Sequence, residues 1–172
     1  LLASDEGGAL LDDAEAMVRA ALGVGEGDPS VALLARAKEG GDRAEAEVEA
    51  ARAARLEGEP KGRERTALER QFDDTVKRET RRAHTAVLDV CLTLTALMLR
   101  DLICLAEGAP EAALDPDRAR SLAAAAGDRD TRRLRVAAER CEQARLALTV
   151  NVTEDLALEA LGYRLAALVG PR

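Results

Sequence analysis

The stretch from Arg63 to Ala106 contains no glycine and no proline, and no other segment constrains the fold so strongly. Its apolar residues recur at steps of three and four, the spacing that places side chains on one face of an α-helix. They are Leu68, Phe72, Val76, Ala83, Val87, Val90 or Cys91, Leu94, Leu97, Met98, Leu102 and Leu105. We predict one long helix, or two collinear helices, whose charged first half projects and whose apolar second half is central to a bundle.

The residue composition favours helices over strands. Of the 172 residues, 47% are apolar but only 1% are aromatic, namely Phe72 and Tyr163, and alanine and leucine dominate. Ala, Leu, Glu and Arg lose little on entering a helix, whereas strands prefer aromatic and β-branched residues. The apolar share excludes wholesale disorder, and two aromatics are too few for a nucleic-acid site built on base stacking. The predicted fold class is therefore an all-α helical bundle.

Glycines, prolines and capping residues divide the rest of the chain into further helices. The predicted helices are Leu10–Leu22, Pro29 to about Glu39, 42–57, Pro116 to about Ala126, one that is capped by Thr131 or Asp130 and has apolar positions to Leu148, and a last one that follows Thr153 and has apolar positions to Leu165. The helix that begins at Pro29 is expected to end at Gly40–Gly41. The helix over 42–57 has little apolar surface, which indicates a solvated arm or one leg of an antiparallel hairpin. We predict two domains, an N-terminal helical extension over 1–62 and a C-terminal helical bundle over 63–172.

The charge pattern argues against a DNA-binding surface and against a membrane-spanning helix. The net charge is −7, so the basic footprint of a DNA-binding domain is absent. The stretch Ala83–Leu99 is nearly uncharged, but it contains Asp89, is followed at once by Arg100–Asp101 and has no aromatic belt. A buried core helix therefore fits it better than a membrane span.

The start of the sequence shows no signal-peptide pattern. It also lacks an initiator methionine, so we expect a piece of a longer chain.

The sequence shows no motif that carries catalysis or cofactor binding. It has no glycine-rich phosphate cradle, and its single histidine, His84, is predicted to be a solvated surface residue. The three cysteines, Cys91, Cys104 and Cys141, lack the spacing of a zinc site and are predicted to be small buried residues in a reducing compartment. We expect no catalytic residue, no cofactor, no metal and no enzymatic activity in this chain.

Two segments carry a more specific pattern. In the first, 98–117, the long helix closes with Arg100–Asp101–Leu102 and a small-residue turn follows; after the turn come Leu114, Pro116 and Asp117. The second, 151–165, opens the last helix with Asn151 and Val152 and continues Leu156–Ala157–Leu158–Glu159. Together the two segments resemble the C-terminal helical domain of the delta-prime subunit of the bacterial DNA polymerase III clamp loader.

The resemblance covers roughly residues 63–168, and the chain departs from the family pattern in several places. Met98 and Leu99 stand where the family has aromatic residues, and Thr153–Glu154 replaces its Asn-Pro pair. The charged helix at 63–82 looks like an insertion that some members carry. The family's ATPase-like module, with its zinc cysteines and its Ser-Arg-Cys arginine finger, lies N-terminal to this domain and is absent from the sequence.

The resemblance implies a collar domain, a module that associates side by side in a pentameric ring. Such a domain is a non-catalytic oligomerisation part of the DNA polymerase III holoenzyme and supports sliding-clamp loading in DNA replication. The expected partners are the tau/gamma and delta subunits in the cytoplasm, with DNA contacted only indirectly and no membrane contact. A closely related interpretation is the equivalent domain of the tau/gamma subunit. The alternative is an unrelated helical adaptor or coiled-coil interaction protein.

Surplus apolar surface predicts where a partner subunit binds. The stretch Val87–Leu105 is apolar on more faces than one neighbouring helix covers, whereas the charged arm over 42–82 has few apolar anchors. We therefore expect the contact on the 87–105 and 153–168 helices. The candidate contact residues are Leu97, Leu102, Leu105, Leu158, Leu161 and Leu165.

Overall fold

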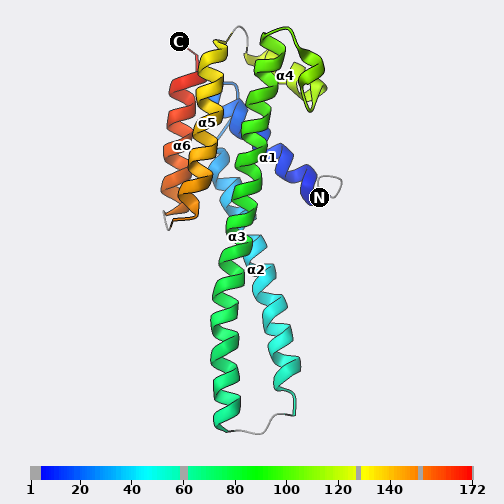
Figure 1. Ribbon diagram of the computed structural model, residues 1–172, viewed down its shortest axis with the longest axis vertical. Coiled ribbons are helices and arrows are strands. Elements are labelled where there is room, and N and C mark those ends of the chain that lie inside the picture. Colours follow the sequence, from blue (N-terminus) through cyan, green and yellow to red (C-terminus); the bar gives the residue numbers. More distant parts are fainter. Residues whose placement is uncertain (1–4, 59–61, 127–128, 151–152, 172) are drawn as a thin grey trace. The chain divides into compact units, whose positions relative to one another are not determined.

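The computed structural model describes residues 5–58, 62–126, 129–150 and 153–171 (Figure 1). Within these ranges the chain forms six α-helices, one short 3-10 helix and no strand, which confirms the all-α class. The elements are α1 (Asp5–Ala21), α2 (Pro29–Leu56), α3 (Arg63–Ala106), η1 (Pro110–Ala112), α4 (Pro116–Ala126), α5 (Thr131–Leu148) and α6 (Glu154–Val169). No helix of the described ranges combines the length and the apolarity that a membrane crossing requires.

Side-chain caps begin several helices where the sequence predicts them. Asp115 precedes Pro116 and accepts a hydrogen bond from the Arg118 amide at 3.1 Å, and Asp130 accepts one from the Arg132 amide at 2.9 Å. Each carboxylate satisfies a backbone N–H that has no partner within its own helix. The long glycine-free stretch forms one continuous helix, α3. Parts of the predicted breaks, at 59–61 and 151–152, lie outside the described residues.

The chain divides into two compact units. The first, here called the bundle, comprises residues 1–34 and 88–172, and the second, here called the hairpin, comprises residues 35–87. This division differs from the predicted domain boundary at residue 62. The reason is that α1 packs against α4 and α6 and therefore belongs with the C-terminal helices.

The bundle has a core built mainly of leucine. In it α5 pairs with α6 and α1 contacts α6. The fully buried leucines are Leu22, Leu33, Leu88, Leu92, Leu99, Leu122, Leu158, Leu161 and Leu165. Cys91 and Cys141 are buried as predicted, whereas Cys104 is half-buried, and all three are free thiols. Burial raises the pKa of the Cys141 thiol to about 12, so this group stays protonated and unreactive at neutral pH.

The hairpin consists of the antiparallel legs of α2 and α3, and it corrects one prediction. Gly40–Gly41 does not end a helix, because α2 runs without a break from Pro29 to Leu56. Both glycines are buried against α3: a Cβ atom on Gly40 would lie 3.2 Å from Val87 Cγ2, and one on Gly41 would lie 3.2 Å from Thr80 Cγ2. The glycines therefore permit a close helix contact.

His84 also departs from its prediction. It is half-buried in the hairpin, and its Cβ lies 3.8 Å from the position of a Cβ on Gly41. The close approach of α2 covers this part of α3, so the side chain is not a freely solvated one.

Candidate functional site

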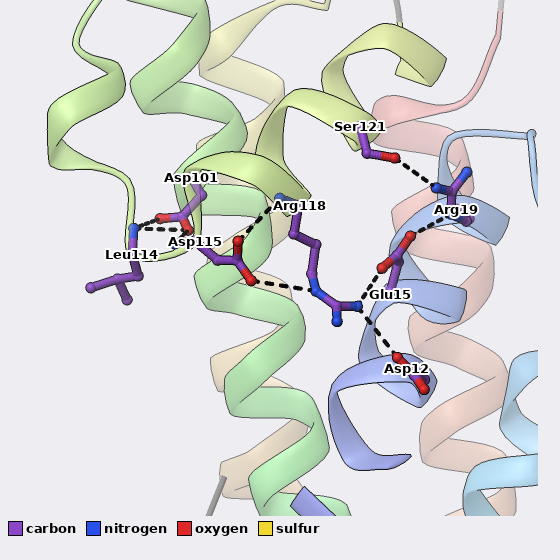
Figure 2. Close-up of polar contacts among 8 residues, drawn as sticks. All are labelled: Asp12, Glu15, Arg19, Asp101, Leu114, Asp115, Arg118 and Ser121. Atoms are coloured by element: carbon purple, nitrogen blue, oxygen red, sulfur yellow. Dashed lines mark hydrogen bonds and ion pairs between the residues drawn. The ribbon is translucent and has the colours of Figure 1, made fainter. Parts of the chain in front are cut away.

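The candidate site is formed where α3 ends and the chain turns back through η1 into α4. Asp101, only 4% exposed, accepts hydrogen bonds from the amides of Leu114 and Asp115, each at 3.0 Å (Figure 2). Arg100 donates to Asp101 at 3.2 Å and to the carbonyl of Ala112 at 3.3 Å. A buried carboxylate is tolerated when charge-assisted hydrogen bonds replace its water. The Arg-Asp pair therefore fastens the turn to the end of α3.

A chain of ion pairs continues from this turn to α1. The Arg118 guanidinium bonds to the Glu15 carboxylate, and it lies 3.5 Å from carboxylate oxygens of both Asp12 and Asp115 (Figure 2). On the other side of Glu15, Arg19 donates to that carboxylate at 2.7 Å. Arg118 is thus surrounded by three carboxylates from α1 and from the cap of its own helix. The network fixes α4 against α1.

Arg19 closes the network on the far side. Its guanidinium donates to the hydroxyl of Ser121 on α4 at 3.2 Å, as Figure 2 shows. Two bonds between α1 and α4, one through Arg118 and one through Arg19, therefore set the spacing of these helices.

An apolar pocket of about 240 Å³, here called the loop pocket, lies beside this network. Its lining combines leucine and methionine side chains with the polar groups already described: Leu11, Leu94, Leu97, Met98, Asp101, Leu114, Asp115, Arg118, Ala119 and Leu122. Leu114 is 65% exposed although Asp101 fixes its backbone. An apolar side chain held by a rigid backbone beside a pocket is suited to protein contact, because little entropy is lost on binding.

The polar groups of this site are arranged for structure rather than for proton transfer. The Asp101 carboxylate is buried and occupied by two backbone amides and Arg100, which leaves little room to accept a substrate proton. Among the described residues no three His, Cys, Asp or Glu side chains gather in a way that holds a metal ion. The arrangement can bury an apolar side chain of another protein in the loop pocket.

The structure separates the six candidate contact leucines into three groups. Leu97 lines the loop pocket, and Leu105 is half-buried near the end of α3. The other four, Leu102, Leu158, Leu161 and Leu165, are buried in the bundle, Leu165 being 1% exposed. Side chains that face the core present no surface to a partner, so these four do not meet the condition of solvent exposure for a subunit contact.

Several exposed apolar residues were missing from the predicted contact set. On α6 they are Leu156 and Tyr163, seven residues apart on the face opposite the core leucines. Residues seven apart share a helix face, so the sequence spacing could have predicted that these two residues lie together. Leu114 is one of the residues on which the family resemblance rests, but it was not among the predicted contact residues. No local sequence pattern predicts the ion pair of Arg118, because its partner Glu15 lies far away in the sequence.

Comparison with known proteins adds no relative: no family model, no curated protein and no solved structure matched the chain.

Proposed function

We propose that this chain is the non-catalytic oligomerisation domain of a delta-prime-like subunit of the DNA polymerase III clamp loader. It supports sliding-clamp loading in DNA replication by packing against the tau/gamma and delta subunits in the cytoplasm, and it touches DNA only indirectly. The proposal starts from the resemblance of residues 98–117 and 151–165 to the collar domain of that family.

One observation carries the proposal. The two halves of the first segment, Arg100–Asp101 and Leu114–Asp115, are joined by the bonds of the buried Asp101 carboxylate to the Leu114 and Asp115 amides. These residues therefore serve a common purpose, the presentation of Leu114 beside the loop pocket. A domain in which a buried carboxylate holds an apolar residue outward is suited to association rather than to chemistry.

The test is a matched pair of substitutions, each of which replaces an exposed leucine by glutamate. Leu114 and Leu146 are both exposed, at 65% and 69%, but Leu114 lies at the loop pocket and Leu146 lies on α5. Binding of the purified chain to the tau/gamma and delta subunits of the same genome is measured by biolayer interferometry. We expect Leu114→Glu to weaken binding by about tenfold or more, because a charge replaces an apolar anchor, and Leu146→Glu to leave it unchanged.

Three results would contradict the proposal. One is that neither subunit binds the unaltered chain. A second is that Leu146→Glu weakens binding while Leu114→Glu does not. The third is binding through the hairpin alone, which would favour the unrelated helical adaptor. Far-ultraviolet circular dichroism of each variant checks that the helices are intact.

A further inference from the structure

A second hollow in the bundle lies between α6, α1 and the first turn of α2. It has a volume of about 470 Å³ and is here called the acidic groove. Its lining is formed by Met17, Ala20, Ala21, Gly27, Asp28, Pro29, Ser30, Leu34, Asp155, Leu158, Glu159, Gly162, Tyr163 and Ala166. Three carboxylates stand among these residues and no lysine or arginine does, so the groove is apolar in its floor and negative at its rim.

All three carboxylate side chains of the groove are exposed. Hydrogen bonds from the Ser30 side chain and backbone lower the pKa of Asp28, which keeps it ionised at neutral pH. Asp155 and Glu159 are exposed, and no ion pair joins either to another residue of the described ranges. Phosphate groups of nucleic acid or of anionic lipid would be repelled by this rim.

Tyr163 is the side chain best placed to anchor a partner. It is the single tyrosine of the sequence, and 73% of it is exposed at the groove. Tyrosine supplies a large apolar area with few rotatable bonds, and it is enriched where proteins bind one another. Leu156 continues the same exposed face of α6, so this face carries more apolar surface than the bundle uses.

Gly162 supplies an independent observation. It lies inside α6, where glycine is destabilising relative to alanine, yet nothing in the described chain lies within 4 Å of the place a Cβ would take. The contrast with Gly40 and Gly41 is direct, because those glycines make room for another helix of this chain. At Gly162 the corresponding room is open and faces the groove.

We propose that the acidic groove binds an amphipathic helix of a partner protein, whose apolar stripe is flanked by arginine or lysine. The α6 wall from Asp155 to Ala166 extends for about three helical turns, which matches a short partner helix laid along it. Gly162 permits close approach of that helix, Tyr163 packs on its apolar stripe, and the three carboxylates meet its basic flanks. This inference goes beyond the proposed function and does not depend on the clamp-loader assignment.

The probe is a fluorescein-labelled synthetic helix of about four turns, with leucine at positions i, i+3, i+4 and i+7 and arginine on both flanks. A second peptide carries glutamate in place of each arginine. Fluorescence anisotropy measures their binding to the full chain. We expect saturable binding of the arginine peptide, weakened by rising salt, and no binding of the glutamate peptide.

Two sets of variants locate the binding. Asp155→Lys with Glu159→Lys should weaken binding of the arginine peptide by about tenfold and make the glutamate peptide the preferred one. Glu111→Lys with Glu139→Lys is the matched control, since both residues are exposed, lie outside the groove and change the net charge equally. Gly162→Leu fills open space inside the groove and should abolish binding with the helices intact.

Each remaining outcome overturns the proposal. The proposal is wrong if the arginine peptide shows no saturable binding. It is also wrong if the control pair weakens binding as much as the groove pair, which would mean nonspecific attraction to an acidic protein. Self-association of the unaltered chain in analytical ultracentrifugation, abolished by Gly162→Leu, would make a second copy the occupant. None of these results depends on the tau/gamma or delta subunits, so failure here is distinct from failure of the clamp-loader proposal.

Discussion

The bundle and the hairpin hold their helices together by different means. In the bundle, leucines from several helices are fully buried together. In the described part of the hairpin, by contrast, the buried residues are Ala37, Gly40 and Gly41, all of them small. Towards its tip the hairpin relies on half-buried side chains and on exposed ion pairs such as Arg52 with Asp73 at 3.0 Å. Stability and binding surface are therefore expected to reside in the bundle.

Removal of one leucine from each unit should have the largest effect on stability. Leu161→Ala opens a cavity in the bundle core and should lower the free energy of unfolding by about 2–5 kcal/mol. Leu68→Ala, at a half-buried hairpin position, should cost much less because less apolar area is lost. Urea denaturation followed by circular dichroism measures both variants. Equal losses would mean that the hairpin has a core comparable to that of the bundle.

A second comparison sets a buried aspartate against an exposed one. Asp101→Ala removes the part-buried hydrogen bonds that the Leu114 and Asp115 amides donate and should cost about 1–3 kcal/mol. Hydrogen exchange should then accelerate at those two amides first. Asp73→Ala, in the hairpin, removes an exposed ion pair with Arg52 and should leave the denaturation midpoint unchanged. A larger effect at Asp73 than at Asp101 would reverse the assignment of the ordered polar network to the bundle.

A third comparison separates the two kinds of helix glycine. Gly41→Leu places a side chain where Thr80 already lies, and it should destabilise the hairpin by about 1–3 kcal/mol. Gly162→Ala meets nothing in the described chain and should stabilise α6 by about 0.5–1 kcal/mol. Hydrogen exchange mass spectrometry reports the two units separately. Destabilisation by Gly162→Ala would show that the space beside α6 is filled within the chain itself.

The sequence allowed the helices to be predicted better than their packing. The long helix from Arg63, and the helices that begin after Asp115 and Asp130, follow from apolar spacing and capping residues, which act locally. The predicted end at Gly40–Gly41 was wrong, because a glycine that breaks a helix and a glycine that lets two helices touch look alike in one sequence.

The candidate site was predictable only in part, for a similar reason. On α6, the residues Leu158, Leu161 and Leu165 and the residues Leu156 and Tyr163 both follow helical spacing, so two faces compete for the core. Tertiary packing decides which of the two faces is buried, and in this structure it is the face with Leu158, Leu161 and Leu165. The ion pair of Arg118 with Glu15 joins segments far apart in sequence, where no local pattern signals it.

We propose that the bundle, and not the hairpin, carries the surface that binds the clamp-loader subunits. The direct test removes the outer hairpin, replacing residues 46–78 by a short Gly-Ser linker where α2 and α3 lie side by side near Gly41 and Thr80. Its affinity for tau/gamma and delta is measured beside that of the intact chain and of Leu114→Glu. We expect the shortened chain to bind as tightly as the intact chain, whereas Leu114→Glu should bind at least about tenfold more weakly. Loss of binding on shortening, with Leu114→Glu unaffected, would contradict it.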